Sequence, residues 1–246
     1  MQILGIDFGG TGIKSAIVDT QKGELVSGRL RLATPERSKP QEVGDVIKEI
    51  ACSFKWKDRI GLGFPAIIKN NIAYNAANIS KKWIGQDVKA LLQERTGCEM
   101  FVVNDADAAG IAEISFGAGQ EFQKGVVLML TLGTGIGSSI FLNSQLLPNT
   151  EFGHIQIRGK DAEHRASDVV RQNKHLSWKA WAKRFQEVLD HLEMLINPDV
   201  IIIGGGASKY YEKYFGYLKT NAQLLPAHFF NQAGIIGAAI YASQQK

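Results

Sequence analysis

The chain has 246 residues, 45% hydrophobic and 21% charged, a composition that excludes collagen, coiled coils and disordered tails. Its net charge of +4 is too small to indicate a nucleic-acid partner by itself. The two cysteines, Cys52 and Cys98, are too few for a disulfide framework and favour a reducing compartment. We find no apolar run of about 18 residues and no signal-peptide pattern, and so expect a cytoplasmic protein without a membrane span.

An apolar strand, a glycine turn and a returning strand open the chain and recur halfway along it. Residues 9–17 read GGTGIKSAI and residues 132–140 read LGTGIGSSI, with six of nine positions identical at an offset of 123. The apolar runs 3–6 and 126–129 precede the two turns at the same offset. We interpret this as a duplicated domain whose copies each open with a glycine-turned β-hairpin.

Strands alternating with helices follow each hairpin. In the first half we expect strands at 24–32, 59–63 and 100–103, and helices at 41–53, 85–95 and 105–116. In the second half we expect a long helix that begins at Ser177 and is stopped by Asn197 and Pro198. It is followed by a strand at 200–203, a helix at 208–218, a short strand near Leu224 and a helix at 234–242. Such alternation predicts parallel sheets in an α/β protein.

Two α/β lobes, 1–118 and 119–246, that each open with such a hairpin and close round a central cleft resemble the actin-like, ribonuclease H-like duplicated fold. Sugar kinases, actin and chaperone ATPases share this fold. In such an arrangement the two glycine turns would face each other across the cleft.

The glycine turns suit phosphate because their backbone amides can converge on one anion. The predicted donor-binding residues are Gly9, Gly10, Thr11, Gly12 and Lys14 in the first copy, and Thr131, Gly133, Thr134, Gly135 and Gly137 in the second. Two such cradles imply a chain of phosphates. Hairpins that merely favour glycine are the alternative.

Asp7 stands beside the first turn, whereas its repeat partner is Leu130. A carboxylate next to an anion site is repulsive unless a cation intervenes, so we expect Asp7 to hold Mg²⁺, directly or through water. Gly204, Gly205 and Gly206 follow an Ile-rich strand and precede a predicted helix, where adenosine or the end of a phosphate chain could lie.

Asp105 ends a predicted strand and begins a helix, a position that suits both an N-cap and a general base for an attacking hydroxyl. Asn104 offers an amide for a sugar hydroxyl, and Asp107 ranks below Asp105. After the second hairpin, Glu151, His154 and Glu163 provide the mixed donors and acceptors that polyols require. A zinc cluster formed by these residues and His164 is the rival interpretation.

Residues 158–184 carry eight basic and three acidic side chains. Such an excess could attract a polyanion, although a solvated helix face is the commoner explanation.

These motifs together resemble the ROK family of sugar kinases and, within it, its polyphosphate-using branch. The resemblance is carried by Asp7–Lys14 (DFGGTGIK), 61–65 (GLGFP), 104–109 (NDADAA), 132–137 (LGTGIG), 151–154 (EFGH), 204–206 (GGG) and 231–239 (NQAGIIGAA). It implies phosphorylation of glucose at the 6-hydroxyl, with Asp105 as base. It implies sugar contacts from Asn104, Glu151, His154 and Glu163, to which we add Gly63 and Asn78. A homodimer is expected from the same resemblance.

The segment 158–167 departs from many ROK members, which carry a cysteine-rich zinc motif there. It contains no cysteine, so we predict no structural zinc. The replacement and the basic residues around it favour polyphosphate over ATP as donor. No N-terminal helix-turn-helix precedes the first strand, which argues against a DNA-binding repressor of this family.

Several alternatives stay open at this point. One is an ATP-dependent ROK hexokinase acting on mannose, glucosamine or an N-acetylhexosamine. A second is a catalytically silent sugar-sensing protein of the same fold, and a third is an actin-like assembling ATPase. The sequence does not distinguish the hexoses, because glucose and mannose differ at a single hydroxyl.

Overall fold

The computed structural model describes residues 1–245 and divides into two compact units. Unit 1 comprises Met1–Ala112 and the C-terminal segment from Gln232, and unit 2 comprises Glu113–Asn231. The sequence predicted lobes of 1–118 and 119–246, whereas this division falls at 112/113 and adds the C-terminal segment to unit 1. The C-terminal helix packs on the first sheet, because its apolar small residues fit the glycines of that sheet.

Unit 1 is built on a six-stranded sheet with the order β3-β2-β1-β5-β8, and β4 also pairs with β2. Its strands are β1 (Gln2–Gly9), β2 (Gly12–Asp19), β3 (Glu24–Leu25), β4 (Leu30–Ala33), β5 (Ile60–Phe64) and β8 (Met100–Asn104). A separate hairpin is formed by β6 (Ile68–Lys69) and β7 (Ile72–Ala73). The helices are α1 (Pro40–Ser53), η1 (Lys81–Trp83), α2 (Val88–Thr96), α3 (Asp105–Phe116), which runs into unit 2, and α7 (Ala233–Gln244).

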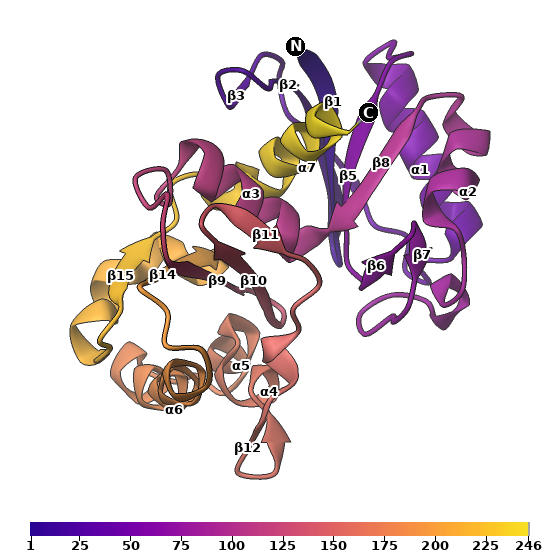
Figure 1. Ribbon diagram of the computed structural model, residues 1–246. Helices are drawn as coiled ribbons and strands as arrows, with labels where there is room; N and C mark the ends of the chain where they lie inside the picture. The colour runs from indigo at the N-terminus through magenta and orange to yellow at the C-terminus, as the bar shows by residue number, and fades with distance from the viewer. Residues whose placement is uncertain (246) are drawn as a thin grey trace. The chain divides into compact units, whose positions relative to one another are not determined.

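Glycines in β1 and β5 allow α7 to lie directly on this sheet (Figure 1). A Cβ atom at Gly5 would overlap the carbonyl oxygen of Ile235, and one at Gly61 would overlap that of Ala238. On the same sheet, α1 and α2 close a core that includes Leu4, Ile47 and Leu92, all fully buried. The parallel strands β1, β5 and β8 are therefore buried, and their carboxyl ends are held at one edge.

Unit 2 repeats this plan with a five-stranded sheet of order β11-β10-β9-β14-β15. Its strands are β9 (Val126–Leu132), β10 (Ile136–Leu142), β11 (Gln145–Leu147), β14 (Val200–Gly205) and β15 (Gln223–Pro226). A small hairpin is formed by β12 (Gln156–Ile157) and β13 (Lys160–Asp161). The helices are η2 (Phe152–His154), α4 (Glu163–Ala166), α5 (Asp168–Asn173), α6 (Trp178–Ile196), η3 (Gly206–Lys213), η4 (Phe215–Tyr217) and η5 (Phe230–Gln232).

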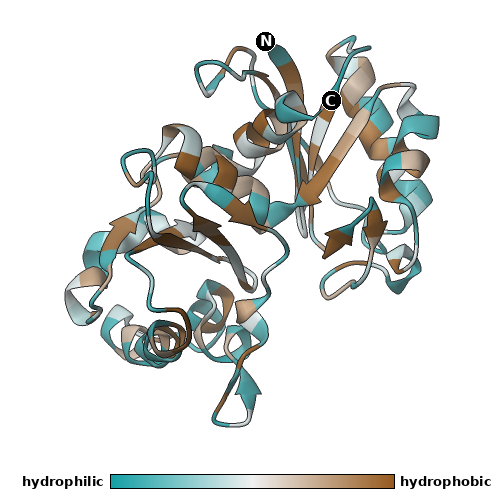
Figure 2. Cartoon of the chain, in the orientation of Figure 1, coloured by the Kyte–Doolittle hydropathy of each residue, from teal (hydrophilic) through white to brown (hydrophobic). Residues whose placement is uncertain are grey.

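Helix α6 covers one face of the second sheet with an apolar stripe that includes Trp181, Phe185 and Leu192. Ser177 caps its start by accepting from the amide of Ala180, and Asn197 ends it in the left-handed conformation. Figure 2 shows the hydrophobic residues concentrated on the strands and on the inner faces of the helices. None of the described helices has the length and apolar character needed to cross a membrane.

Most predicted elements are present within a few residues of their expected bounds, with two corrections. The predicted strand 24–32 is interrupted and forms β3 and β4. The predicted helix 208–218 is two 3₁₀ segments, with non-helical angles at Tyr210. Here packing overrides helical periodicity, since the buried Tyr214 stacks on Trp178 and meets Trp181 edge-on.

Candidate active site

The carboxyl ends of β1, β5 and β8 bring the predicted catalytic residues of unit 1 together. Asp7 lies opposite Gly63 in the parallel register of β1 and β5, and Asn104 lies opposite Phe64 on the next strand. A Cβ atom at Gly63 would lie 3.6 Å from Cα of Asp105. Thus four of the predicted residues share one edge of the sheet, as expected for a ligand site in an α/β fold.

Asp105 is the one residue between positions 101 and 114 that is not buried. Its helix is capped by Asn104, whose Oδ1 accepts from the amides of Ala106 and Asp107 at 2.9 and 3.1 Å. Asn104 Nδ2 donates to the carbonyl of Ala66 at 3.1 Å. The N-cap role predicted for Asp105 therefore belongs mainly to Asn104, while the Asp105 carboxylate accepts from the next amide, that of Ala106. Asp107 is 1% exposed, which agrees with its lower rank.

The first glycine turn is held by two side chains from the segment at β4. Gly9 pairs with Gly12, which leaves a tight turn at Gly10 and Thr11. Thr34 Oγ1 donates to the carbonyl of Gly9 at 2.6 Å, and Arg31 Nη2 donates to the carbonyl of Thr11 at 3.0 Å. The carbonyls of Gly9 and Thr11 thereby each receive a side-chain donor, and a guanidinium lies beside the turn.

Asp7 faces Lys14 across the first hairpin, where the two residues are directly opposite. Lys14 Nζ and Asp7 Oδ2 form an ion pair at 2.9 Å, and both side chains are mostly buried. Lys14 thus places one cation beside this carboxylate, where the sequence predicted Mg²⁺. A single carboxylate also fits Mg²⁺, which proteins hold through one or two carboxylates together with water and substrate phosphates.

The second turn differs from the first by one residue. Leu132 pairs with Ile136, whereas the exact repeat would pair it with Gly135. The turn is therefore three residues long, and its Gly133 amide donates to the carbonyl of Gly135 at 3.1 Å. The two copies match in sequence, but their hairpins do not have the same strand register.

The triple glycine lies next to the second turn in unit 2. Gly204 is opposite Thr131, and Gly205 opposite Leu132, in the parallel register of β14 and β9. Gly205 has a φ of +75°, and a Cβ atom there would lie 2.5 Å from the Leu132 carbonyl oxygen. The structure thus brings the predicted donor residues of unit 2 to one edge of the sheet.

Glu163 packs against the second turn. Its Oε2 accepts from the amide of Ile136 at 3.3 Å, and a Cβ atom at Gly135 would overlap the same oxygen. His164 Nε2 lies 3.8 Å from Glu163 Oε1. A carboxylate therefore occupies part of the turn that the sequence assigned wholly to phosphate.

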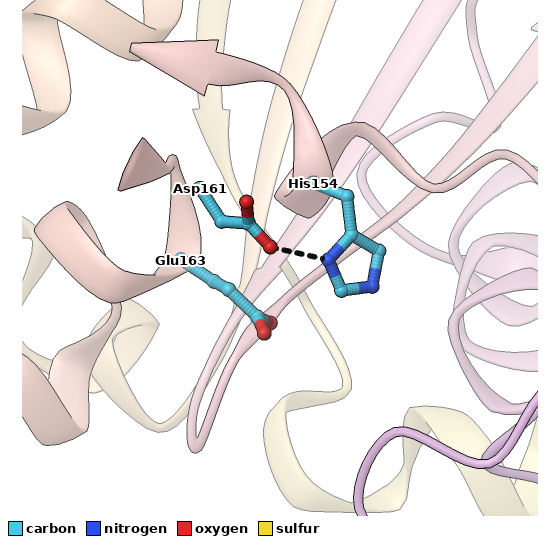
Figure 3. Close-up of side chains that lie close together, drawn as sticks. All are labelled: His154, Asp161 and Glu163. Atoms are coloured by element: carbon cyan, nitrogen blue, oxygen red, sulfur yellow. Dashed lines mark hydrogen bonds and ion pairs between the residues drawn. The ribbon is translucent and has the colours of Figure 1, made fainter. Parts of the chain in front are cut away.

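The side chain of His154 lies close to the carboxylates of Asp161 and Glu163 (Figure 3). Its Nδ1 is 2.9 Å from Asp161 Oδ2, and its Nε2 is 3.9 Å from Glu151 Oε2. The hydrogen bond with Asp161 raises the pKa of His154, partial burial opposes this, and Glu163 and Glu151 raise it further. The same bond lowers the pKa of Asp161. The three predicted sugar residues of unit 2 therefore lie in one region, and the neighbouring carboxylates orient the imidazole of His154.

Metal-ligand geometry is available in this region. Ligand atoms of His154, Asp161 and Glu163 lie within 4.8 Å of one another. The group offers one nitrogen and two carboxylate oxygens, and His154 Nδ1 is already engaged by Asp161. Cys52 and Cys98 belong to unit 1 and are free thiols.

Two further predicted features have less structural support. Asn78 is exposed in an irregular segment between β7 and η1. Within the basic segment, Arg158 and Arg165 pair with Glu187, and Arg171 pairs with Asp168. The exposed cations of this segment include Lys160, Lys174, Lys179 and Lys183. Part of the basic excess is therefore structural, and the lysines remain exposed to solvent.

Comparison with known proteins places these motifs in one family. A model described as ROK family matches residues 3–173. The chain belongs to the ROK family. It is 41% identical over 237 residues to a polyphosphate glucokinase of Mycobacterium tuberculosis, covering 96% of this chain and 89% of that protein. The corresponding Mycobacterium leprae protein is 39% identical and is covered over 73% of its length.

Solved structures of ROK proteins agree with this assignment. The inorganic polyphosphate/ATP-glucomannokinase of Arthrobacter sp. strain KM superposes with a TM-score of 0.96 at 41% identity, covering 100% of this chain and 99% of that one. A ROK family glucokinase from Streptomyces griseus, solved with glucose and AMPPNP, gives 0.84 at 24% identity, with complete coverage of both chains. The fold is therefore the actin-like two-lobed fold of ROK sugar kinases, as the sequence predicted.

Three residues near the predicted sites of this ROK protein escaped the sequence analysis. Arg31 and Thr34 reach the first turn from the segment at β4, and Asp161 reaches His154 from β13. The segment at β4 carries no motif, and residues 158–167 bear on the prediction only through their missing cysteines and the basic residues around them. Only the pairing of β4 with β2 and the tight β12–β13 hairpin bring these side chains to the sites.

Proposed function

We propose that this protein is a kinase that transfers a phosphoryl group from polyphosphate or ATP to the 6-hydroxyl of glucose or a related hexose. The observation that carries the proposal is Asp105, a partly exposed carboxylate in an otherwise buried stretch, at the carboxyl ends of three parallel strands. Its support from relatives is the 41% identity to proteins named for polyphosphate-dependent phosphorylation of glucose and mannose.

In the proposed reaction the Asp105 carboxylate orients the sugar hydroxyl and accepts its proton. The hydroxyl oxygen forms a bond to the terminal phosphorus as the bridging P–O bond breaks. The leaving phosphate chain takes the electron pair of that bond, and the Asp105 proton returns to solvent. Base catalysis of this kind contributes about 10²- to 10⁴-fold to rate.

The donor phosphates are assigned to the amides and side chains of the two turns. In unit 1 these are Gly9, Gly10, Thr11, Gly12 and Lys14, with Arg31 added by the structure. In unit 2 they are Thr131, Gly133, Thr134, Gly135, Gly204 and Gly205. Asp7 would hold Mg²⁺, directly or through water, and the ion would neutralise charge on the phosphates. Lys14 and Asp7 remain oriented by their ion pair in either case.

The sugar is assigned to Asn104, Gly63 and Asn78 in unit 1 and to Glu151, His154 and Glu163 in unit 2. Carboxylates accept from sugar hydroxyls, whereas an imidazole donates or accepts through one nitrogen. Asn104 already uses its oxygen for capping and one amide hydrogen for the carbonyl of Ala66, so its second amide hydrogen is the atom left to act on the substrate. Among these assignments, that of Asn78 rests on sequence alone.

Polyphosphate is the favoured donor, on the ground of the exposed lysines of residues 160–183 and the printed names of the relatives. The test is formation of glucose 6-phosphate with polyphosphate and with ATP, each with Mg²⁺, across glucose, mannose, glucosamine and N-acetylhexosamines. Turnover with both donors and a higher kcat/KM for polyphosphate is expected. Absence of turnover with either donor on every hexose would contradict the proposal and favour a sugar-sensing protein.

Two properties of the whole molecule are proposed with the activity. A cytoplasmic location is supported by the free thiols of Cys52 and Cys98. A homodimer is supported by the family resemblance, and light scattering coupled to size exclusion tests it: a mass near 54 kDa is expected for two chains of about 27.0 kDa each. A single-chain mass at assay concentration would contradict it.

A further inference from the structure

A carboxylate outside the predicted site holds the ring of His154. Asp161 Oδ2 lies 2.9 Å from His154 Nδ1, in the hydrogen bond drawn as a dashed line in Figure 3, and Asp161 Oδ1 accepts from the side chain of Gln156. Asp161 and Gln156 are directly opposite each other in the β12–β13 hairpin. The carboxylate is therefore fixed on one side by its strand partner and directed at the imidazole on the other.

The hairpin that carries Asp161 is rigid by construction. Its two-residue turn places Arg158 at a φ of +52° and Gly159 at +73°, the left-handed pair that matches the twist of a β-hairpin. The backbone amide of Ala162 also donates to the carbonyl of Ile155, which ties the end of the hairpin to the residue after His154. Asp161 and His154 are thus joined through the backbone as well as through their side chains.

The hydrogen bond determines which nitrogen of His154 remains for a ligand. A carboxylate only accepts, so His154 Nδ1 must carry the proton that it donates to Asp161. Nε2 is then the ring atom left to face other groups, and it points toward the Glu151 side, 3.9 Å from Oε2. The hydrogen bond with Asp161 therefore sets the Nδ1-protonated form of this ring.

Resting on the proposed function, we propose that Asp161 is a positioning residue of the sugar site: it holds the His154 ring through Nδ1 and so presents Nε2 to a sugar hydroxyl. Asp161 itself does not need to touch the sugar. A carboxylate that orients a histidine in this way fixes the direction of the ring and the nitrogen that carries the proton. Its loss weakens sugar binding although the histidine is still present.

The direct test is nitrogen-15 NMR of the five histidines, with His154 assigned by its absence in His154→Gln. The sample is dialysed against a chelator, so that no metal shifts the signals. In the wild type we expect a protonated Nδ1 on His154, and in Asp161→Ala a shift toward the Nε2-protonated tautomer. A wild-type His154 with unprotonated Nδ1 would overturn the proposal, whether or not the protein proves to be a kinase.

The functional arm is calorimetry of glucose without any phosphoryl donor. Loss of one charge-assisted hydrogen bond should weaken glucose binding about tenfold or more in Asp161→Ala and less in Asp161→Asn. Glu121→Ala, which removes an exposed carboxylate elsewhere in unit 2, is the control and should bind glucose within about twofold of wild type. Thermal unfolding of all variants identifies any that fail to fold. If Asp161→Ala is one of them, the nitrogen-15 signals of His154 in Asp161→Asn serve as the second readout.

The outcomes separate the inference from the function on which it rests. Glucose binding unchanged in a folded Asp161→Ala variant would contradict the positioning role. The inference also predicts that Asp161→Ala leaves the donor KM within about twofold of wild type. An equal rise in the glucose and donor KM values would indicate general disruption of unit 2 and overturn it. A wild-type protein that binds glucose without turnover would contradict the proposed kinase activity but not the positioning role of Asp161.

Discussion

The two glycine turns began as one repeated sequence, but the structure gives them opposite electrostatic surroundings. The first has a two-residue turn flanked by Lys14 and Arg31, and both of its outer carbonyls are occupied. The second has one more residue, and the amide of Ile136 beside it donates to the Glu163 carboxylate. Similar glycines therefore do not imply equal phosphate affinity, because the neighbouring charges decide how much negative charge each turn tolerates.

The largest effect is expected from the residue that performs the chemistry beside the first turn. Asp105→Asn removes the proton acceptor but keeps the shape of the side chain, so kcat should fall about 10²- to 10⁴-fold. The donor KM should change little, because neither turn loses a contact. Steady-state kinetics with both substrates varied provides the measurement, and near-wild-type kcat would show that another group is the base.

The cationic side of the comparison is tested at Arg31. Arg31→Gln removes the guanidinium beside the first turn and should raise the donor KM about tenfold, since charge-assisted hydrogen bonds contribute about 1.5–3 kcal/mol. Arg29→Gln makes the same charge change at an exposed position two residues earlier and is the matched control. Equal effects of both variants would mean that net charge, and not the position of Arg31, controls donor binding.

A matched pair of glycine substitutions sharpens the difference between the turns. A Cβ atom at Gly12 would lie 2.6 Å from Arg31 Nε, whereas one at Gly135 would meet Glu163. Both neighbours are ends of flexible side chains that can move aside. Gly12→Ala should therefore raise the donor KM alone, whereas Gly135→Ala should raise both the donor KM and, through displacement of Glu163, the glucose KM, each by about three- to tenfold. If both variants changed the same KM values to the same extent, the two turns would not differ in the way described.

The smallest effect concerns pH and the carboxylates of unit 2. His154 has its pKa raised by Asp161, Glu163 and Glu151, so its stabilising contribution is complete below about pH 6.5 and is lost as pH rises through the folded-state value. Wild type should therefore exceed His154→Gln in free energy of unfolding by more at pH 6 than at pH 8.5. Urea unfolding of both proteins at the two pH values measures this, and an unchanged or reversed difference would contradict it.

The sequence predicted what short-range patterns determine. The strand and glycine patterns located both hairpins, and the strand-to-helix boundary located Asp105. Asn104 and Asp105 are both good capping residues, so the pattern could not decide which one caps α3. That decision depends on Asn104 reaching Ala66, a contact made only when β8 and the segment after β5 lie side by side.

What the sequence could not show depends on contacts between distant residues. The register shift in the second hairpin leaves no sign in the repeat, because Gly133, Thr134 and Gly135 permit either turn length. Arg31 and Asp161 lie in short edge elements whose partners are set by tertiary packing. Likewise, the 3₁₀ segments of residues 206–217 follow from the packing of Tyr214 on two tryptophans, which local propensity does not encode.

Calorimetry with tripolyphosphate, in the absence of sugar, tests the central claim most directly. The account predicts opposite signs for two single substitutions. Arg31→Gln should weaken tripolyphosphate binding about tenfold, because it removes a cation from the first turn, whereas Glu163→Gln should strengthen it about twofold, because it removes an anion from the second. If Arg31→Gln binds as tightly as wild type, or if Glu163→Gln binds more weakly, the surroundings of the two turns do not divide donor binding as described.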